Sequence, residues 1–376
     1  MVFKSFGKKL YVVLIVVGVV LAVLVGLIWW NFRAGRVPVP PAATPPPGAE
    51  IPLAVSLAQK LEIPWSLAFL PDGSLIFTER PGRIRLIDAR QGLLVEPLLT
   101  VDEVAHRGEG GLLGLTVHPK FTSNHFIYVY YTYQGRASLA NRVVRFRMDG
   151  KALVDRKIII DDIPASTIHD GGRIKFGPDG LLYITAGDAS AAEQAQDKNS
   201  LAGKILRVTE DGAIPPGNPF PGSPVYSFGH RNPEGLAWDA QGRLWATEHG
   251  SSATDELNLI EAGKNYGRPV IRGDETAPGM ESPVIHSGSD TWAPSGLAYF
   301  NGSLFFAGLR GQSLFQAVVE DHRVTLRQHL SRSFGRLRDV VVGPDQLFYI
   351  CTSNRDGRGV PTPDDDQIIR INPAKL

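Results

Sequence analysis

Cysteine is almost absent from this chain. Among 376 residues only Cys351 occurs, in the apolar run LFYICTS. One cysteine cannot form a disulfide within the chain, so disulfide bonds do not hold this fold together. Its apolar neighbours favour a buried, unreactive thiol over a reactive one. The nine histidines are scattered, and with a single cysteine they form no zinc-binding motif.

Several sequence motifs of enzymes are also missing. The chain has no G-x-S-x-G elbow, no P-loop and no G-x-G-x-x-G dinucleotide fingerprint. Chemistry on nucleotide phosphates or with a nicotinamide cofactor therefore has no support. Beyond residue 53 there is also no long amphipathic helical pattern, which points away from helical folds.

Excess charge is lacking as well. The whole chain has a formal charge of +1, but residues 1–36 contain five Lys or Arg and no acid, which leaves about −4 for the remainder. A slightly acidic remainder argues against a nucleic-acid partner.

The first 36 residues predict a membrane anchor. Leu10 to Trp30 form 21 residues without a charge, enough for a helix to cross the roughly 30 Å hydrocarbon core. Three preceding lysines favour a cytoplasmic N-terminus with the rest of the chain outside, although Arg33 and Arg36 weaken this orientation. A cleaved signal peptide is the alternative, but the run is longer than usual and no small-x-small cleavage site directly follows.

A proline-rich linker follows at residues 37–52. Seven of its sixteen residues are proline, which excludes a helix and favours extended polyproline conformation. We therefore expect three parts: the anchor or signal segment at 1–36, the linker at 37–52, and a globular domain at 53–376.

The globular domain is built from a repeated unit of two apolar runs joined by a turn. The turns carry Pro-Asp-Gly, Gln-Gly or Asn-Gly, which are hairpin signals between β-branched and aromatic residues. The six copies begin 43 to 62 residues apart, at Leu67, Leu115, Ile174, Leu236, Leu297 and Val340. Repeats of this size with three to four strands predict an all-β six-bladed β-propeller, with residues 51–59 closing the ring. A β-sandwich pair does not explain the repeat, and β-helix repeats are much shorter.

Polar residues at the ends of these hairpins predict a site at one rim of the propeller. His169 precedes the inner strand of the third repeat and Asp188 follows its second strand, so the hairpin returns both to the same rim. In the fourth repeat, Arg231 and Asn232 hold the equivalent place and could bind a carbonyl or carboxylate. The alternative for Arg231 is a loop arginine paired with a blade carboxylate.

The segment TEHGSSATDELNLIEAGKNYG, residues 247–267, is acidic and irregular. Such loops offer calcium carboxylate and backbone oxygens, although the spacing is not that of an EF-hand. Asp255 and Glu256 could equally be solvated turn residues.

Three more arginines and one glutamate are candidates. Arg336 and Arg338 lie two residues apart in an extended segment, so both would face the same way and repel each other without an anion between them. Surface exposure is the alternative. Arg310 comes from another repeat. Glu109 lies in a glycine-containing loop and could face the pocket or bond to backbone.

Seven segments occur in the order found in one known family: GEGGLLGLTVHP, HDGGRIKFGPDGLLYITAGD, GKILRVTEDGAIPPGNPF, GHRNPEGLAW, EHGSSATDELNLI, GKNYGRP and RLRDVV. Together they resemble the soluble pyrroloquinoline quinone (PQQ)-dependent aldose sugar dehydrogenases of the glucose/sorbosone dehydrogenase family. The resemblance covers about residues 55–373.

The resemblance implies PQQ and Ca²⁺ as cofactors and specific roles for the rim residues. His169 matches the general base that takes the proton of the sugar's anomeric hydroxyl while hydride moves to C5 of the quinone. Asp188 matches the carboxylate that orients His169. Arg231 and Asn232 match residues that bind the quinone carbonyls, Arg231 also stabilising charge on the oxygen. Arg336 and Arg338 match the pair that holds the quinone carboxylates.

The metal ligands and the departures from the family also follow from the resemblance. Gly250 and Ser251 match backbone-carbonyl ligands of calcium, and Asp255 matches a carboxylate that reaches the ion through water. Arg310 stands where the family often has a lysine against the quinone, and Ser251 where it often has proline. Glu109 stands where a glutamine near the substrate is common.

The implied function is oxidation of aldose sugars to lactones on the periplasmic side of the bacterial inner membrane, anchored there or secreted to the periplasm after cleavage. A membrane quinone or periplasmic cytochrome would accept the electrons. Two other functions stay open: a non-catalytic propeller that binds a glycan or protein, and a calcium-dependent lactonase-type hydrolase. The latter would hold calcium in the central channel through inward acidic and amide side chains.

Overall fold

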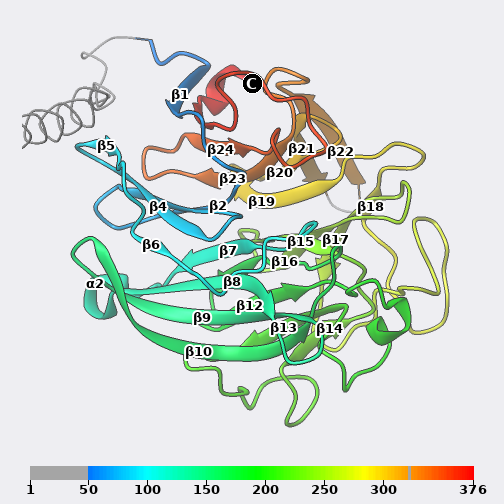
Figure 1. Cartoon of the computed structure of the whole chain (residues 1–376). Coiled ribbons are helices and arrows are strands. Elements are labelled where there is room, and N and C mark those ends of the chain that lie inside the picture. Colours follow the sequence, from blue (N-terminus) through cyan, green and yellow to red (C-terminus); the bar gives the residue numbers. More distant parts are fainter. Residues whose placement is uncertain (1–49, 321–322) are drawn as a thin grey trace, which may run out of the picture. The chain divides into compact units, whose positions relative to one another are not determined.

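The computed structural model describes residues 50–320 and 323–376 (Figure 1). The predicted membrane segment and almost all of the linker lie outside these residues. Within the described part, no helix has the length and apolar character needed to span a membrane.

Six antiparallel sheets make up the described residues, and each contains four strands in a continuous ladder (Figure 1). Five sheets use strands that follow one another in sequence, and the sixth combines the last three strands with the first. The predicted six-bladed propeller is thereby confirmed. Blades 1 to 6 below follow the order of their inner strands.

Blades 1 to 3 are formed by the first half of the chain. Blade 1 contains β2 (Pro64–Phe69), β3 (Leu75–Glu79), β4 (Arg83–Asp88) and β5 (Gly92–Leu93), with β6 (Leu99–Thr100) also paired to β4. Blade 2 contains β7 (Leu112–Val117), β8 (Phe126–Gln134), β9 (Leu139–Asp149) and β10 (Ala152–Pro164), with the short helix α2 (Phe121–Asn124) in its first turn. Blade 3 contains β11 (Ile174–Phe176), β12 (Leu182–Ala186), β13 (Lys204–Val208) and β14 (Val225–Phe228), with the 3₁₀ helix η1 (Ala192–Ala195).

Blades 4 to 6 follow the same plan. Blade 4 contains β15 (Pro233–Trp238), β16 (Leu244–Glu248), β17 (Glu256–Ile260) and β18 (Ile285–His286). Blade 5 contains β19 (Pro294–Phe300), β20 (Ser303–Gly308), β21 (Ser313–Glu320) and β22 (Arg323–His329). Blade 6 contains β23 (Leu337–Val342), β24 (Phe348–Thr352), β25 (Ile368–Ile371) and the N-terminal strand β1 (Ala54–Ala58), and the chain ends in the 3₁₀ helix η2 (Pro373–Lys375).

The ring is closed where the two ends of the domain meet in blade 6. β1 pairs antiparallel with β25, and Ala54 lies opposite Ile371. This is the closure predicted from residues 51–59. Beside it, Ile369 and Ile350 are almost fully buried in a cluster shared with the aromatic side chains of blade 5.

The hairpin turns form for local reasons that the sequence shows. In the Pro-Asp-Gly turn of blade 3, Asp179 accepts a hydrogen bond from the Leu181 backbone N–H at 3.1 Å, and Gly180 has φ of +75°. A carboxylate that bonds the backbone two residues on and a glycine at positive φ are the two requirements of such a turn.

Glycines let the inner strands approach one another closely around the axis. A Cβ on Gly114 of β7 would lie 2.1 Å from the Gly172 carbonyl oxygen, and one on Gly235 of β15 would lie 2.4 Å from that of Ser295. Larger residues would therefore push neighbouring blades apart. Cys351 is fully buried in β24, and burial raises the pKa of its thiol, as expected for an unreactive cysteine.

The topology puts the starts of the inner strands and the ends of the second strands on one rim. His169, Arg231 and Arg336 come just before inner strands, whereas Asp188 and Gly250 follow second strands. All five therefore lie at the same rim, and the hairpin turns lie at the opposite one.

The closing blade generates a stability prediction. Ile369→Ala should lower the free energy of unfolding by about 2–5 kcal/mol, because the removed atoms leave a cavity in a packed core. Urea unfolding followed by tryptophan fluorescence measures the loss. Val360→Ala, at a residue 91% exposed, is the control and should change stability by less than about 0.5 kcal/mol. Equal midpoints for both variants would contradict the described packing of blade 6.

Candidate active site

His169 and Asp188 meet at the rim of blade 3. Their Nδ1 and Oδ1 atoms are 2.7 Å apart, and Asp188 is fully buried. An ionised carboxylate accepts the Nδ1–H, which leaves the Nε2 lone pair as the basic position of the imidazole. Nε2 has no hydrogen-bond partner among the described residues, and the His169 side chain is 11% exposed. The ring can therefore accept a proton from a bound ligand.

Asp188 has a second partner, Arg268, which the sequence did not indicate. The Arg268 Nε lies 3.0 Å from Asp188 Oδ2. Burial acts to raise the pKa of Asp188, but the hydrogen bond from His169 and the charge of Arg268 outweigh it and lower the pKa. Asp188 thus stays ionised and keeps the histidine in one tautomer.

The main chain of His169 is held from the other side by Glu109. Glu109 Oε2 accepts the His169 backbone N–H at 2.9 Å, and its Oε1 lies 2.5 Å from Nη1 of Arg358. Of the two alternatives for Glu109, the structure therefore displays the bond to backbone.

Arg231 and Asn232 lie next to this pair, immediately before β15. The Asp188 backbone N–H donates to the Arg231 carbonyl oxygen at 2.7 Å, and Asn232 Oδ1 accepts the Gly171 N–H at 2.9 Å. Arg231 Nη1 donates to the His249 carbonyl oxygen at 3.1 Å, while its Nε is buried without a partner in the described residues. Burial and the nearby Arg268 lower the pKa of Arg231. Among the described residues, the Arg231 guanidinium thus has no carboxylate partner and keeps an unsatisfied donor.

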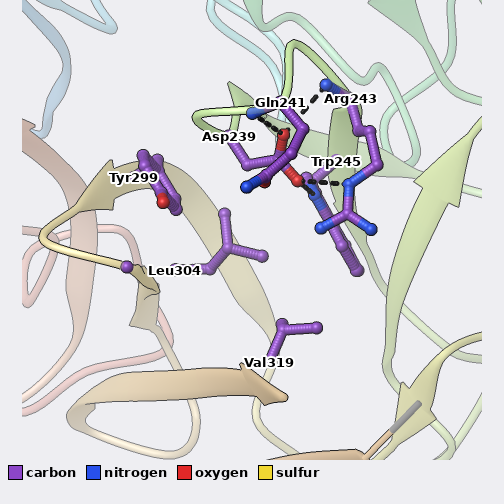
Figure 2. Close-up of a pocket in the computed structure, with 8 residues that line it drawn as sticks. Asp239, Gln241, Arg243, Trp245, Tyr299, Leu304 and Val319 are labelled. Carbon is purple, nitrogen blue, oxygen red and sulfur yellow. Dashed lines mark hydrogen bonds and ion pairs between the residues drawn. The ribbon is translucent and has the colours of Figure 1, made fainter. Parts of the chain in front are cut away.

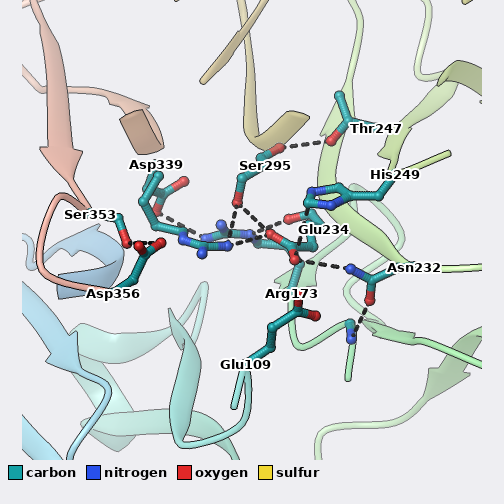
Figure 3. Close-up of polar contacts among 12 residues, drawn as sticks. Glu109, Arg173, Asn232, Glu234, Thr247, His249, Ser295, Asp339, Ser353 and Asp356 are labelled. Atoms are coloured by element: carbon teal, nitrogen blue, oxygen red, sulfur yellow. Dashed lines mark hydrogen bonds and ion pairs between the residues drawn. The ribbon is translucent and has the colours of Figure 1, made fainter. Parts of the chain in front are cut away.

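Glu234 is the junction of the polar network at the channel mouth (Figure 3). One carboxylate oxygen accepts from Arg338 Nη1 at 2.5 Å and from Ser295 Oγ at 2.8 Å. The other accepts from Asn232 Nδ2 at 3.1 Å and lies 3.7 Å from His249 Nε2. The buried glutamate therefore connects two predicted cofactor ligands, Asn232 and Arg338.

Arg336 and Arg338 are buried, so the surface alternative is wrong for both. Arg336 donates from Nη2 to Asp356 Oδ2 at 2.8 Å, while Arg338 pairs with Glu234. The repulsion between the two arginines led us to predict an external anion. Carboxylates of the protein itself reduce this repulsion. The Nε of Arg338 stays buried without an acceptor among the described residues.

Arg310 is not brought into this cluster. It is exposed after β20, and its side chain forms no hydrogen bond or ion pair with another described residue. Its predicted place beside the cofactor stays a prediction.

The loop after β16 lines a cavity of about 270 Å³ together with Arg231 and Arg268, and Gly250 and Ser251 belong to its walls. Asp255 is buried and accepts backbone N–H groups from Gly250 at 2.8 Å and from Trp292 at 2.6 Å. It therefore shapes the loop, and the alternative of a solvated turn residue is wrong for Asp255.

Two glutamates of the same cavity lie near this loop. Burial and the neighbouring Glu248 carboxylate raise the pKa of Glu256 to about 8.

No group of three or more His, Cys, Asp or Glu able to hold a metal occurs in the part of the chain that the structure describes. The predicted calcium ligands, however, are main-chain carbonyl oxygens, which the absence of side-chain clusters does not test. Calcium therefore stays a prediction.

The two largest of the described cavities lie away from His169. One of about 470 Å³ opens between the hairpin turns of blades 4 and 5 (Figure 2). Its Asp239 already accepts from the Arg243 and Trp245 side chains at 2.7 and 2.9 Å. The other, of about 530 Å³, is lined by all six inner strands. There Asp339, the one acidic residue among the described lining residues, pairs with Arg173 at 2.9 Å and is therefore not a free ligand for a lactonase-type calcium site.

The site residues that the sequence analysis did not identify share one property. Arg268, Glu234, Arg358 and Asp356 act as charge partners of predicted residues, and each comes from a different blade or loop than its partner. Glu234 was visible as a charged residue inside an apolar inner strand. The loop residues carried no comparable signal.

The chain is similar to several known proteins. The family model described as Glucose / Sorbosone dehydrogenase matches residues 61–368. The structure of a PQQ-bound aldose sugar dehydrogenase from Streptomyces coelicolor is 41% identical, covers 88% of this chain and 99% of that chain, and has a TM-score of 0.81. A structure described as a glucose dehydrogenase, from Thermus thermophilus, is 46% identical with a TM-score of 0.80, over 85% and 99% of the two chains. The Escherichia coli aldose sugar dehydrogenase YliI is 33% identical over 335 residues, 80% of this chain and 90% of that protein.

The Arg268–Asp188 pair predicts a pH-dependent stability difference. Asp188 has a lowered pKa in the folded state, so it stabilises the fold above its unfolded value of about 3.9, and this contribution is lost as pH falls through the folded pKa. Arg268→Gln should make the pKa of folded Asp188 less strongly lowered, because it removes the neighbouring positive charge. The variant should therefore be less stable than the parent above about pH 4, and the difference should shrink in more acidic solution.

Urea midpoints measured from pH 7 to pH 2.5 test this expectation. Arg272→Gln is the matched control, since Arg272 lies nearby, is 62% exposed and lies 3.8 Å from Glu275. A stability difference for Arg268→Gln that is constant across pH would show that the arginine does not act on Asp188.

Proposed function

The chain belongs to the glucose/sorbosone dehydrogenase family, and we propose that it is a PQQ-dependent dehydrogenase that oxidises aldoses at the anomeric carbon to lactones. The observation that carries the proposal is the His169–Asp188 pair, 2.7 Å apart, with Nε2 free at the propeller rim. The open Nε2 separates this pair from the buried His230–Glu248 pair, in which Ser227 Oγ lies 2.8 Å from the His230 Nε2.

The donors at the rim fit a planar ligand rich in carbonyl and carboxylate oxygens. The Nε–H groups of Arg231 and Arg338 are buried without acceptors in the described residues. Buried donors of this kind are unfavourable unless a ligand supplies the acceptor. Asn232 keeps one amide hydrogen for a ligand, because only its other groups are engaged by Gly171 and Glu234. Arg231 and Asn232 would hold the quinone carbonyls, and Arg336 and Arg338 would hold the carboxylates.

The chain's own residues would perform the proton chemistry. When bound, the quinone supplies the acceptor for the hydride from the sugar's anomeric carbon. His169 Nε2 takes the proton of the anomeric hydroxyl, and the carbonyl group of the lactone forms. Asp188 stabilises the imidazolium produced, because its carboxylate lies 2.7 Å from the opposite ring nitrogen, Nδ1. Arg231 places a guanidinium where negative charge develops, which stabilises the transition state.

Calcium would be held by the carbonyl oxygens of Gly250 and Ser251, with Asp255 fixing the shape of the loop. Hard cations accept such main-chain oxygens. The ion would hold the quinone against the loop and polarise it.

We place the active domain on the periplasmic side of a bacterial inner membrane. Residues 10–30 would anchor it there, or it would be released into the periplasm if they are cleaved. Electrons would leave to a membrane quinone or a periplasmic cytochrome.

The first prediction from this proposal concerns His169. With PQQ, calcium and an artificial dye, the purified protein should reduce the dye when glucose or another aldose is added. His169→Gln should lower kcat by about 10²- to 10⁴-fold, because a positioned general base is removed. Omission of the quinone is the control. Undiminished turnover in His169→Gln would contradict the assigned base.

The second prediction concerns the metal. Chelation should abolish turnover and weaken quinone binding measured by titration calorimetry, and added Ca²⁺ should restore both. Ser251→Ala should keep the same calcium requirement, because only its main-chain oxygen is a predicted ligand. A Ser251→Ala variant that no longer binds calcium would instead identify the hydroxyl group as the ligand.

A further inference from the structure

We propose that Glu109 is a positioning residue: it fixes the main chain of His169 and thereby the direction of the imidazole, and it does not act by contacting the sugar. The inference rests on the proposed function insofar as His169 is the base. It assigns Glu109 a role different from the one implied by its similarity to substrate residues of the family.

The backbone of His169 needs support because its conformation is unfavourable. His169 has φ of +64°, in the left-handed region that residues with a Cβ rarely adopt. Such conformations persist where surrounding contacts determine them, and they are frequent at functional sites. The direction of the His169 side chain therefore depends on what holds its peptide groups.

Both peptide groups of His169 are held by close neighbours. Its N–H donates to Glu109 Oε2 at 2.9 Å, and its carbonyl accepts from Ala189 N at 3.2 Å. On the carbonyl side, a Cβ on Gly187 would lie 2.0 Å from the His169 oxygen, so the chains touch there. Glu109 is thus the side chain that fixes the N–H side.

Glu109 is itself firmly placed. Its backbone N–H donates to the Thr167 carbonyl oxygen at 2.8 Å, and Arg358 holds its second carboxylate oxygen. Burial acts to raise its pKa, but the His169 N–H and Arg358 lower it to about 2. The carboxylate is therefore ionised throughout the neutral range and continues to accept the His169 N–H.

Arg358 should contribute less than Glu109 to the positioning of His169. Arg358 comes from the loop after β24 in blade 6, whereas Glu109 precedes β7 in blade 2, so the pair joins loops from two non-neighbouring blades. The arginine side chain is 57% exposed, and exposed ion pairs contribute little because water and salt screen them. Arg358 restricts where Glu109 can point, while Glu109 holds the base.

Three substitutions at residue 109 separate positioning from sugar contact. Glu109→Ala removes the acceptor for the His169 N–H, and Glu109→Asp keeps the charge but shortens its reach by one methylene. Both should lower kcat roughly 10- to 10²-fold, because a misdirected base is inefficient, with KM within about twofold of the parent. Glu109→Gln keeps an oxygen acceptor at the same reach and should retain kcat within about threefold.

A second measurement needs neither quinone nor turnover. In the cofactor-free protein, the His169 ring ¹⁵N and Nδ1–H resonances report the bond to Asp188. They should change in Glu109→Ala and Glu109→Asp and stay at the parent positions in Glu109→Gln. Asp155→Asn is the control, since it removes an exposed carboxylate 2.7 Å from Arg147 in blade 2 and should alter neither kcat nor these resonances.

The outcomes are distinct. A higher KM with unchanged kcat in Glu109→Ala or Glu109→Asp would identify a sugar contact and overturn the proposal, as would His169 resonances unchanged in both. If Glu109→Ala does not fold, Glu109→Asp carries the same test. If no protein, including the parent, oxidises aldoses, the proposed function fails, whereas the resonances still decide whether Glu109 positions His169.

Discussion

Charge pairing at the propeller axis is the constraint on which the rest of this structure depends. Arg173 on the third blade reaches Asp339 on the sixth at 2.9 Å, and Asp339 also accepts the backbone N–H of Leu67 on the first at 2.9 Å. Trp65 packs under both Arg173 and Arg338, 4.3 and 5.6 Å from its ring centre. An unpaired charge in this buried space would be strongly unfavourable, so these pairs stabilise the observed arrangement of the blades.

The same rule extends to the rim that holds the candidate active site. Asp188 is paired with Arg268, Glu109 with Arg358, Glu234 with Arg338 and Asp356 with Arg336. Each pair neutralises a carboxylate, and together they leave a small number of groups unsatisfied, chiefly His169 Nε2 and the buried Nε–H groups of Arg231 and Arg338. The chemistry that the site can perform is defined by what this pairing leaves open.

The architecture could be predicted from the sequence because each blade carries its own signals. Turn residues, apolar runs and their spacing are local, and six repeats of them leave few alternatives to a propeller. The His169–Asp188 contact could be predicted for the same reason, since a hairpin of two short strands must return to the rim from which it began.

The partners of the site residues could not be predicted in this way. Arg268 and Arg358 lie in irregular loops. Contacts between blades determine the path of these loops, and such contacts leave no periodic pattern in the sequence. The spacing of Arg336 and Arg338 predicts that both face one channel, but not that Asp356 and Glu234 accept from them. Arg310, placed by resemblance alone, is exposed. Similarity to a family predicts which residue types occur at a position. It predicts less reliably which contacts those residues make.

The closing of the ring by β1 and β25 has a consequence for biosynthesis. Ser56 and Gln367, which hydrogen-bond across this seam, are 311 residues apart in the chain. Contacts of such separation form late, since the intervening chain must be ordered first. A nascent chain can stack its early blades while it is being made, but it cannot complete blade 6 until its final strand has emerged. Because Arg336, Asp356 and Arg358 belong to that last blade, a competent rim exists only in finished molecules.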